Sequence, residues 1–231
     1  MESKIILVLG LLFFVSFRFY AQKNDKNNNR INKNKLTGKE IVLRLNELNF
    51  FNLTDKKDLR ITKEDFEKSY DELNFFEGYM REDLSFTDNR FYFIDSEALF
   101  EGGGLIQYLE TVKISFDKLK LKLLISDEFH DMTDKHWLHT IKLNGKEYIA
   151  FDDDFGNYDW TIAYLNFIAM LNDQLQIQGS AEQFYPITSG NDGKIVLLTK
   201  EQFEFVKQNY PDDAEHPKEI NSWKDGFDFK N

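Results

Sequence analysis

The sequence predicts an α+β fold in which helices pack on a small antiparallel sheet built from hairpins, with a small helical N-terminal lobe. Three observations support this prediction. Apolar residues recur at steps of three and four in several segments, which is typical of amphipathic helices. Strand-like runs occur in pairs around short turns, most clearly at Asn144-Gly145. The 23 Phe, 10 Tyr and 3 Trp residues supply the apolar area of a well-buried interior.

The first 36 residues precede the predicted fold. Residues 1–21 have a positively charged start and an apolar run over 5–17 that is too short for an ordinary membrane-spanning helix. They predict a secretory signal peptide cleaved after Ala21, with an uncleaved N-terminal anchor as the alternative. Residues 22–36 are rich in Asn and Lys and predict a disordered basic linker. We therefore expect an exported bacterial protein, periplasmic or secreted, that contacts a membrane if its signal stays uncleaved.

Residues 37–80 are expected to form the helical N-terminal lobe. Thr37 is placed to cap a helix whose apolar residues follow at helical spacing. Thr62 and Asp65 resemble a capping box for a second helix that continues through Leu73. The two helices are amphipathic, so each should bury one face.

The main α+β domain is expected over residues 81–210. The predicted strands cover residues 90–94, 120–126, 137–143, 146–151, 182–188 and 194–198. The predicted helices are one opened by the glycine-rich segment 101–104 and continuing to 119, one over 160–175 capped by Asp159, and one over 200–209 capped by Thr199. Residues 211–231 show little periodicity and are interpreted as an acidic tail.

The charge of the chain is unevenly distributed. Of the net charge of −11, residues 1–21 carry +1 and residues 22–36 carry +4, so residues 37–231 carry −16. This body repels phosphate backbones and disfavours nucleic-acid binding. It attracts a basic protein and accelerates their encounter, although solubility outside the cell explains the same charge. The absence of cysteine excludes disulfides, thiolate metal sites and thiol catalysis.

A histidine and an aspartate on the predicted hairpin form a candidate catalytic pair. A two-residue turn at Asn144-Gly145 pairs His139 with Ala150 and Trp137 with Asp152. His139 and Asp152 would then share a face within side-chain reach, as do the base and orienting carboxylate of a nucleophilic triad. The simpler interpretation of His139 is a half-buried strand histidine with a satisfied hydrogen bond.

The segment from His139 to Asp152, preceded by the glycine-rich helix start at 101–104, resembles the core of transglutaminase-like and papain-like cysteine enzymes. The resemblance covers residues 101–154, under a quarter of the chain. It implies that His139 and Asp152 are a vestigial catalytic pair and that a cysteine belongs at the helix start. Because the chain has no cysteine, the resemblance implies a fold retained for binding, and we expect no enzymatic activity.

Three histidines within ten residues suggest a metal site. His130 and Asp134, with a further histidine, offer the ligand types that zinc binds. His136 and His139 are three residues apart on a predicted strand, so they should project to opposite faces and not bind one ion together.

A second acidic segment is a candidate calcium site. Asp152 and Asp154 begin a run of aspartates whose glycine and acidic spacing differs from that of an EF-hand loop. We expect no cofactor, with calcium or zinc as the alternatives.

These observations lead to the expectation of an exported, acidic, non-enzymatic binding protein, such as an immunity-type partner of a toxic or degradative protein. The expected partner is a basic protein, and the oligomeric state is left open. One alternative is an envelope hydrolase or transferase using His139 and Asp152. Another is a glycan- or peptide-binding module using exposed aromatic residues such as Trp137 and Trp223.

Overall fold

The computed structural model describes residues 36–70, 79–81, 86–101, 104–210 and 214–226. The expected signal peptide and residues 22–35 of the expected linker lie outside the described residues, as do 71–78 of the expected N-terminal lobe. Parts of the expected tail, 211–213 and 227–231, also lie outside them. Within the described ranges, no helix combines the length and apolarity that crossing a membrane requires.

The described residues form seven α-helices, one 3₁₀ helix and six strands. In chain order these are α1 (Gly38–Glu47), η1 (Phe50–Leu53), α2 (Leu59–Ser69), β1 (Phe91–Phe93), α3 (Ser96–Phe100), α4 (Gly104–Lys118), β2 (Ile125–Met132), β3 (His136–Leu143), β4 (Lys146–Asp154), α5 (Asp159–Ile177), β5 (Glu182–Thr188), β6 (Lys194–Thr199), α6 (Lys200–Asn209) and α7 (Ile220–Gly226). The predicted α+β class is confirmed. The strands form two three-stranded antiparallel sheets, ordered β1-β6-β5 and β2-β3-β4.

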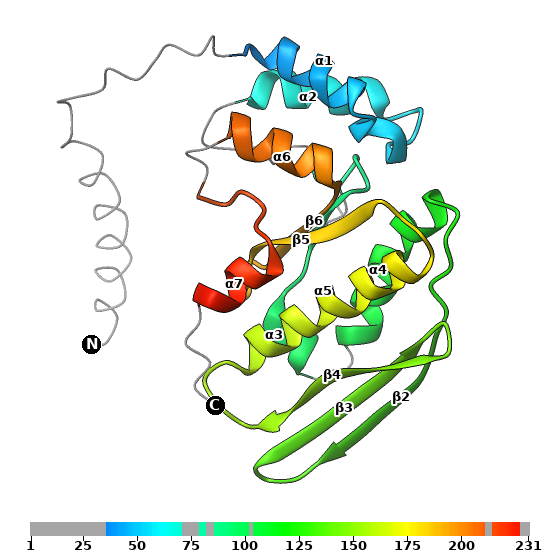
Figure 1. The fold of residues 1–231 in the computed structure, drawn as a ribbon, viewed down its shortest axis with the longest axis vertical. Helices are drawn as coiled ribbons and strands as arrows, with labels where there is room; N and C mark the ends of the chain where they lie inside the picture. Colours follow the sequence, from blue (N-terminus) through cyan, green and yellow to red (C-terminus); the bar gives the residue numbers. More distant parts are fainter. Residues whose placement is uncertain (1–35, 71–78, 82–85, 102–103, 211–213, 227–231) are drawn as a thin grey trace, which may run out of the picture. The chain divides into compact units, whose positions relative to one another are not determined.

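The two sheets differ in how many faces they bury. Alternate residues of β6 enter two different apolar clusters, because neighbouring side chains point to opposite faces of a sheet. Ile195 and Leu197 pack with α4 and α5, whereas Val196 and Leu198 pack with α1, α2 and α6. The inner faces of β3 and β4 join the cluster of α4 and α5. The resulting order is helices, sheet, helices, sheet, with the β2-β3-β4 sheet last (Figure 1).

The helices of the expected N-terminal lobe share a core with the C-terminal half of the chain. Ile41 and Leu45 of α1 and Phe66 of α2 lie in the same buried cluster as Phe203 and Val206 of α6. Residues 36–231 accordingly form one compact unit. The helices bury their apolar faces against β5, β6 and α6, since two short helices cannot bury enough area alone.

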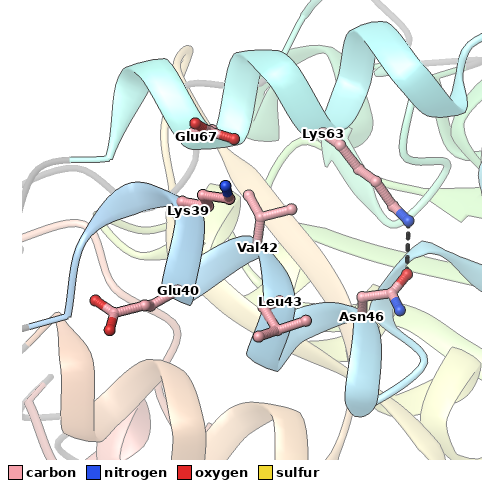
Figure 2. A pocket seen from close by; sticks show the side chains of 7 residues that line it. All are labelled: Lys39, Glu40, Val42, Leu43, Asn46, Lys63 and Glu67. Carbon is pink, nitrogen blue, oxygen red and sulfur yellow. Dashed lines mark hydrogen bonds between the residues drawn. The ribbon is translucent and has the colours of Figure 1, made fainter.

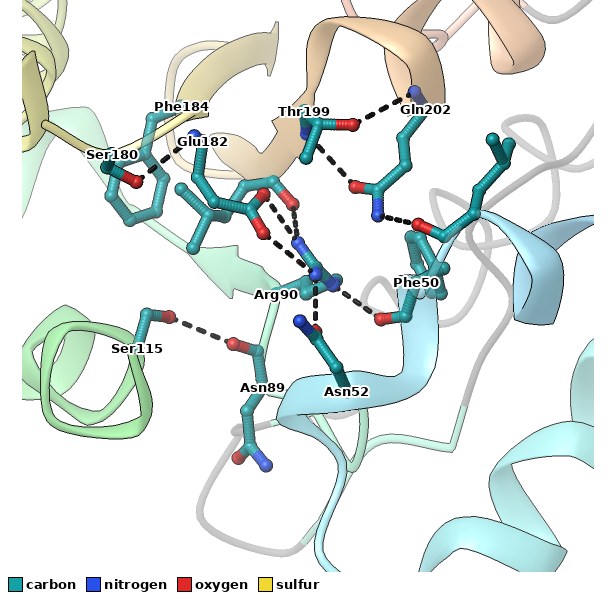
Figure 3. A network of polar contacts seen from close by, with 12 residues as sticks. Phe50, Asn52, Asn89, Arg90, Ser115, Ser180, Glu182, Phe184, Thr199 and Gln202 are labelled. Carbon is teal, nitrogen blue, oxygen red and sulfur yellow. Dashed lines mark hydrogen bonds and ion pairs between the residues drawn. The ribbon is translucent and has the colours of Figure 1, made fainter. Parts of the chain in front are cut away.

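Arg90 joins η1, β5 and β6 through a network of polar contacts (Figure 3). Its guanidinium is fully buried and donates to Phe50 O (2.5 Å), Asn52 Oδ1 (2.6 Å) and Leu197 O (2.8 Å). It also forms a two-pronged ion pair with Glu182, at 2.9 and 3.1 Å. All five N–H donors of the side chain therefore have acceptors, which a buried arginine requires.

Local signals identified the caps of α1 and α6 correctly. The predicted cap of α5 was wrong, because its N-cap is Tyr158 and Asp159 is the first residue of the helix. The capping box of α1 joins Thr37 and Glu40, and that of α6 joins Thr199 and Gln202. The prediction for α2 was wrong by four residues, since the helix begins at Leu59 with Asp58, and not Thr62, as its N-cap. Thr62 lies inside it, with its hydroxyl on Asp58 O at 2.9 Å.

Three other elements differ from expectation. The strand predicted over 120–126 lies later, at β2, whose exposed and mostly polar residues hide it from a search for apolar runs. A short helix, α3, precedes α4 and is capped by Asp95. The expected tail contains α7, whose Ile220 and Trp223 pack against the larger cluster.

Candidate functional site

The β3–β4 hairpin contains a bulge that decides where the predicted pair lies. Leu143 pairs with Lys146 as predicted, but His139 pairs with Phe151 and not with Ala150. Ala150 has no partner on β3 and is the extra residue of the bulge, so both Ala150 and Phe151 point into the interior. Every later side chain of β4 therefore lies on the face opposite to the one that strict alternation predicts. The predicted register beyond the bulge was wrong, and the structure does not bring His139 and Asp152 together.

His139 instead meets two side chains of β2. Its Nε2 lies 3.0 Å from Glu128 Oε1, and His130 Nε2 lies 3.4 Å from the same oxygen. His130 and His139 are direct cross-strand neighbours, with ring centroids 4.1 Å apart and planes 24° apart. Among the described residues, this trio forms the one group of three metal-ligating side chains whose ligand atoms all lie within 4.8 Å of one another.

The trio has a buried side and an open side. His139 is 2% exposed, and the buried indole of Trp137 stacks on its ring at 5.0 Å and 15°. The side chain of His130 is 40% exposed. Burial lowers the pKa of His139 and nearby His130 adds to this effect, whereas Glu128 opposes it.

His136 lies on the opposite face, as its spacing from His139 predicted. Its Nε2 lies 3.1 Å from Asp152 Oδ1, and its Nδ1 lies 3.1 Å from Asp154 Oδ1. Asp134 is exposed in the turn between β2 and β3. The predicted metal candidates are therefore divided: His130 joins the inner trio, whereas Asp152 and Asp154 contact His136 on the outer face.

The outer face of the β2-β3-β4 sheet is an uncovered surface with an apolar centre. Register places Phe129, Thr140 and Ile149 in one row across the three strands. Phe129 and Ile149 are 53% and 51% exposed, so nothing in the described part of the chain covers them. Leu138 occupies the next row between Asp131 and Asp152.

Carboxylates surround this apolar centre. Residues on the face or its border are Asp127, Asp131, Glu147, Asp152 and Asp154, all exposed. Lys142 is the cation of the same face, and its Nζ pairs with Asp127 at 3.0 Å, which raises the pKa of Lys142. We define the outer acidic face as Phe129, Leu138 and Ile149 together with these five carboxylates. It has the apolar core and polar rim of a protein interface.

The calcium candidate and the glycine-rich segment both have structural explanations. Asp159 Oδ1 accepts a hydrogen bond from Gly156 N at 2.9 Å, at the first turn of α5. Gly104 begins α4 where a Cβ atom would lie 1.8 Å from Ala98 O, so the close contact between α3 and α4 requires glycine. Gly102 and Gly103 lie outside the described residues.

Two hollows lie elsewhere on the surface. One of about 460 Å³ lies between α1 and α2, where Lys63 donates to Asn46 Oδ1 (Figure 2). A second of about 250 Å³ lies beside β5 and α7. Neither is lined by a histidine or by a predicted site residue. The buried position of Trp137 also removes it from the exposed aromatic residues that a glycan-binding module would need.

The predictions missed Glu128, Phe129 and Ile149. Glu128 and Phe129 belong to β2, which was placed too early in the chain. One signal for the bulge was present: strict alternation from Leu143 would send Phe151 outward and Asp152 inward, which contradicts their polarity. Comparison with protein-family models, curated proteins and solved structures finds no match to this chain.

Proposed function

We propose that this protein is an exported, non-enzymatic binding protein whose outer acidic face docks a basic protein, in the manner of an immunity partner of a toxic or degradative protein. The observation that carries the proposal is the uncovered sheet face with a half-exposed apolar row and a border of carboxylates. Exposed apolar patches with polar borders are characteristic of protein-binding sites.

Charge selects the kind of partner. Residues 37–231 carry −16, and Asp131, Asp152 and Asp154 concentrate part of that charge beside Leu138 and His136. A second copy of the chain would bring an equally acidic face against this one, and like charges repel. A basic surface with apolar side chains at its centre satisfies both components of the face.

The test has two steps: capture of a binding partner, and measurement of its affinity for a variant of the outer acidic face. The intact chain is exposed to envelope and secreted fractions at low and moderate salt, and a protein retained at low salt is purified. Its affinity is then compared for wild type and for the double variant Phe129→Thr, Ile149→Thr, which keeps strand propensity and removes the apolar row. We expect a basic partner, salt-sensitive binding and at least about a tenfold loss of affinity in the variant, as for central interface residues.

A matched control separates this face from other apolar surfaces. Leu43 on α1 and Ile177 at the end of α5 are as exposed as the outer row, and Leu43 lines the α1–α2 groove. The variant Leu43→Gln, Ile177→Gln should bind like wild type. Loss of binding in this control, or equal binding by the Phe129→Thr, Ile149→Thr variant, would contradict the proposal. So would a self-associated chain that the Thr variant returns to monomer in sedimentation, because that result assigns the face to a second copy.

A further inference from the structure

We infer that Glu128, His130 and His139 form a solvent-accessible site for one zinc-class divalent ion on the inner face of the β2-β3 pair. This site is independent of the outer acidic face, since it uses the opposite side of the strands. Its ligand set is two imidazole nitrogens and one carboxylate oxygen, which zinc binds in three-ligand sites that keep a position open. Calcium and magnesium prefer sites made of oxygen atoms alone.

The spacing of the ligand atoms suits a tetrahedral ion. Bonds of about 2.0–2.1 Å place the ligands of tetrahedral zinc about 3.3–3.4 Å apart. Glu128 Oε1 lies 3.0 Å from His139 Nε2 and 3.4 Å from His130 Nε2. The three residues each offer one ligand atom such that these atoms lie within 4.8 Å of one another. The ion would replace the direct contacts between the carboxylate and the imidazoles with small changes in side-chain position.

The backbone holds the three ligands in advance. His130 and His139 are paired residues of adjacent strands, and a register shift between Ser126 and Phe129 precedes them. Asp127 has φ +50° at this shift, a left-handed conformation that lets Glu128 approach His139. Trp137 stacks on His139 and fixes the plane of its ring. Ligands on strands with packed neighbours lose little freedom when an ion binds.

Exposure defines the open side of the site. Because the side chain of His130 is 40% exposed while that of His139 is 3% exposed, an ion would have protein behind it and solvent before it. Three protein ligands leave a fourth position for water. The ion would also link the edge strand β2 to the central strand β3, so binding should raise the unfolding temperature of the protein.

The test is zinc binding by the intact, untagged chain, measured in competition with a chromophoric chelator. We expect one Zn²⁺ per chain, with affinity reduced more than about tenfold in Glu128→Gln and in His130→Ala. Loss of an outer-shell partner already costs about 10–100-fold, and loss of a direct ligand costs more. Co²⁺ should give the visible absorption of a four-coordinate site in wild type and lose it in both variants.

His136→Asn is the matched control, because His136 contacts Asp152 and Asp154 on the opposite face. It should bind Zn²⁺ like wild type. Circular dichroism of each metal-free variant reports folding, and Glu128→Gln, which preserves shape, carries the test alone if His130→Ala unfolds. Absence of saturable one-to-one Zn²⁺ binding would overturn the inference. A loss in His136→Asn with none in Glu128→Gln would overturn it as well, since it moves the ion to the outer face.

Discussion

Arg90 shows how a single charged residue can organise an interior. Its side chain lies between η1, β5 and β6, and every N–H group has an acceptor. A buried charge is tolerated when a partner and hydrogen bonds compensate its desolvation, and Glu182 with three further oxygens provides both. Arginine suits this position because its planar fork reaches several acceptors at once.

Replacing Arg90 by lysine should destabilise the protein strongly. A lysine ammonium has three donors, so some of the five acceptors, including buried Glu182, would lose their partner. We expect the free energy of unfolding to fall by about 3–5 kcal/mol, as when a buried pair is broken. Denaturant unfolding followed by circular dichroism measures the change. Arg60→Lys, at an exposed pair with Glu64, should leave the midpoint unchanged; equal effects in the two variants would contradict the argument.

Residue type alone did not reveal these partners. Arg90 was predicted as the start of a strand, and nothing near it in the sequence indicates Glu182, which lies 92 residues away. His139 was recognised as a candidate, but its actual neighbour, Glu128, lay in a segment not predicted to be a strand. The sequence shows which residue types are present, whereas the contacts between their side chains depend on strand register and topology.

Elements with local determinants were predictable. The Asn144-Gly145 hairpin was correct because φ angles of +51° and +83° require residues that tolerate the left-handed region. The caps at Thr37 and Thr199 were correct because another local interaction decides them: each threonine side chain accepts a hydrogen bond from the backbone N–H three residues later. The bulge at Ala150 was not predicted, since its cause is the tertiary requirement that Phe151 enter the core beside Phe100 and Trp137.

The contact between β4 and α5 should make stability depend on pH. Asp173 of α5 accepts a hydrogen bond from Lys146 Nζ at 2.6 Å and another from the Tyr148 hydroxyl, and these contacts lower the pKa of Asp173. A lowered pKa in the folded state stabilises the fold above the unfolded pKa of about 3.9, and this contribution is lost as pH falls through the folded pKa.

Asp173→Asn should therefore be less stable than wild type at pH 7, and the gap should narrow as pH falls below about 4 toward the lowered folded pKa of Asp173. The difference at pH 7 should stay under about 1 kcal/mol, because the Asp173 side chain is 36% exposed and solvent screens the pair. Unfolding temperatures measured from pH 3 to 8 test this. A gap between Asp173→Asn and wild type that stays constant over this pH range would contradict the assignment.

At the scale of the molecule, the proposed function assigns different roles to net charge and to the docking face. The net charge of −16 over residues 37–231 would act at a distance and steer a basic partner toward the protein, which affects the association rate. The outer acidic face would act at contact and affect the dissociation rate, because Asp131, Asp152 and Asp154 lie in the rows beside the apolar centre. The two effects are separable, because equal changes in net charge can be made on or away from this face.

The triple variant Asp131→Asn, Asp152→Asn, Asp154→Asn should bind the captured basic partner with a slower association rate and a faster dissociation rate than wild type. Its matched control, Asp117→Asn, Asp192→Asn, Glu110→Gln, removes the same charge from α4 and the β5–β6 turn, so its association should slow similarly while its dissociation rate stays at the wild-type value. Surface-immobilised kinetics at two salt concentrations measure both rates. If the two triple variants have the same dissociation rate, the carboxylates of the outer acidic face attract the partner at a distance but make no contact with it in the complex. The docking surface would then have to lie elsewhere on the molecule.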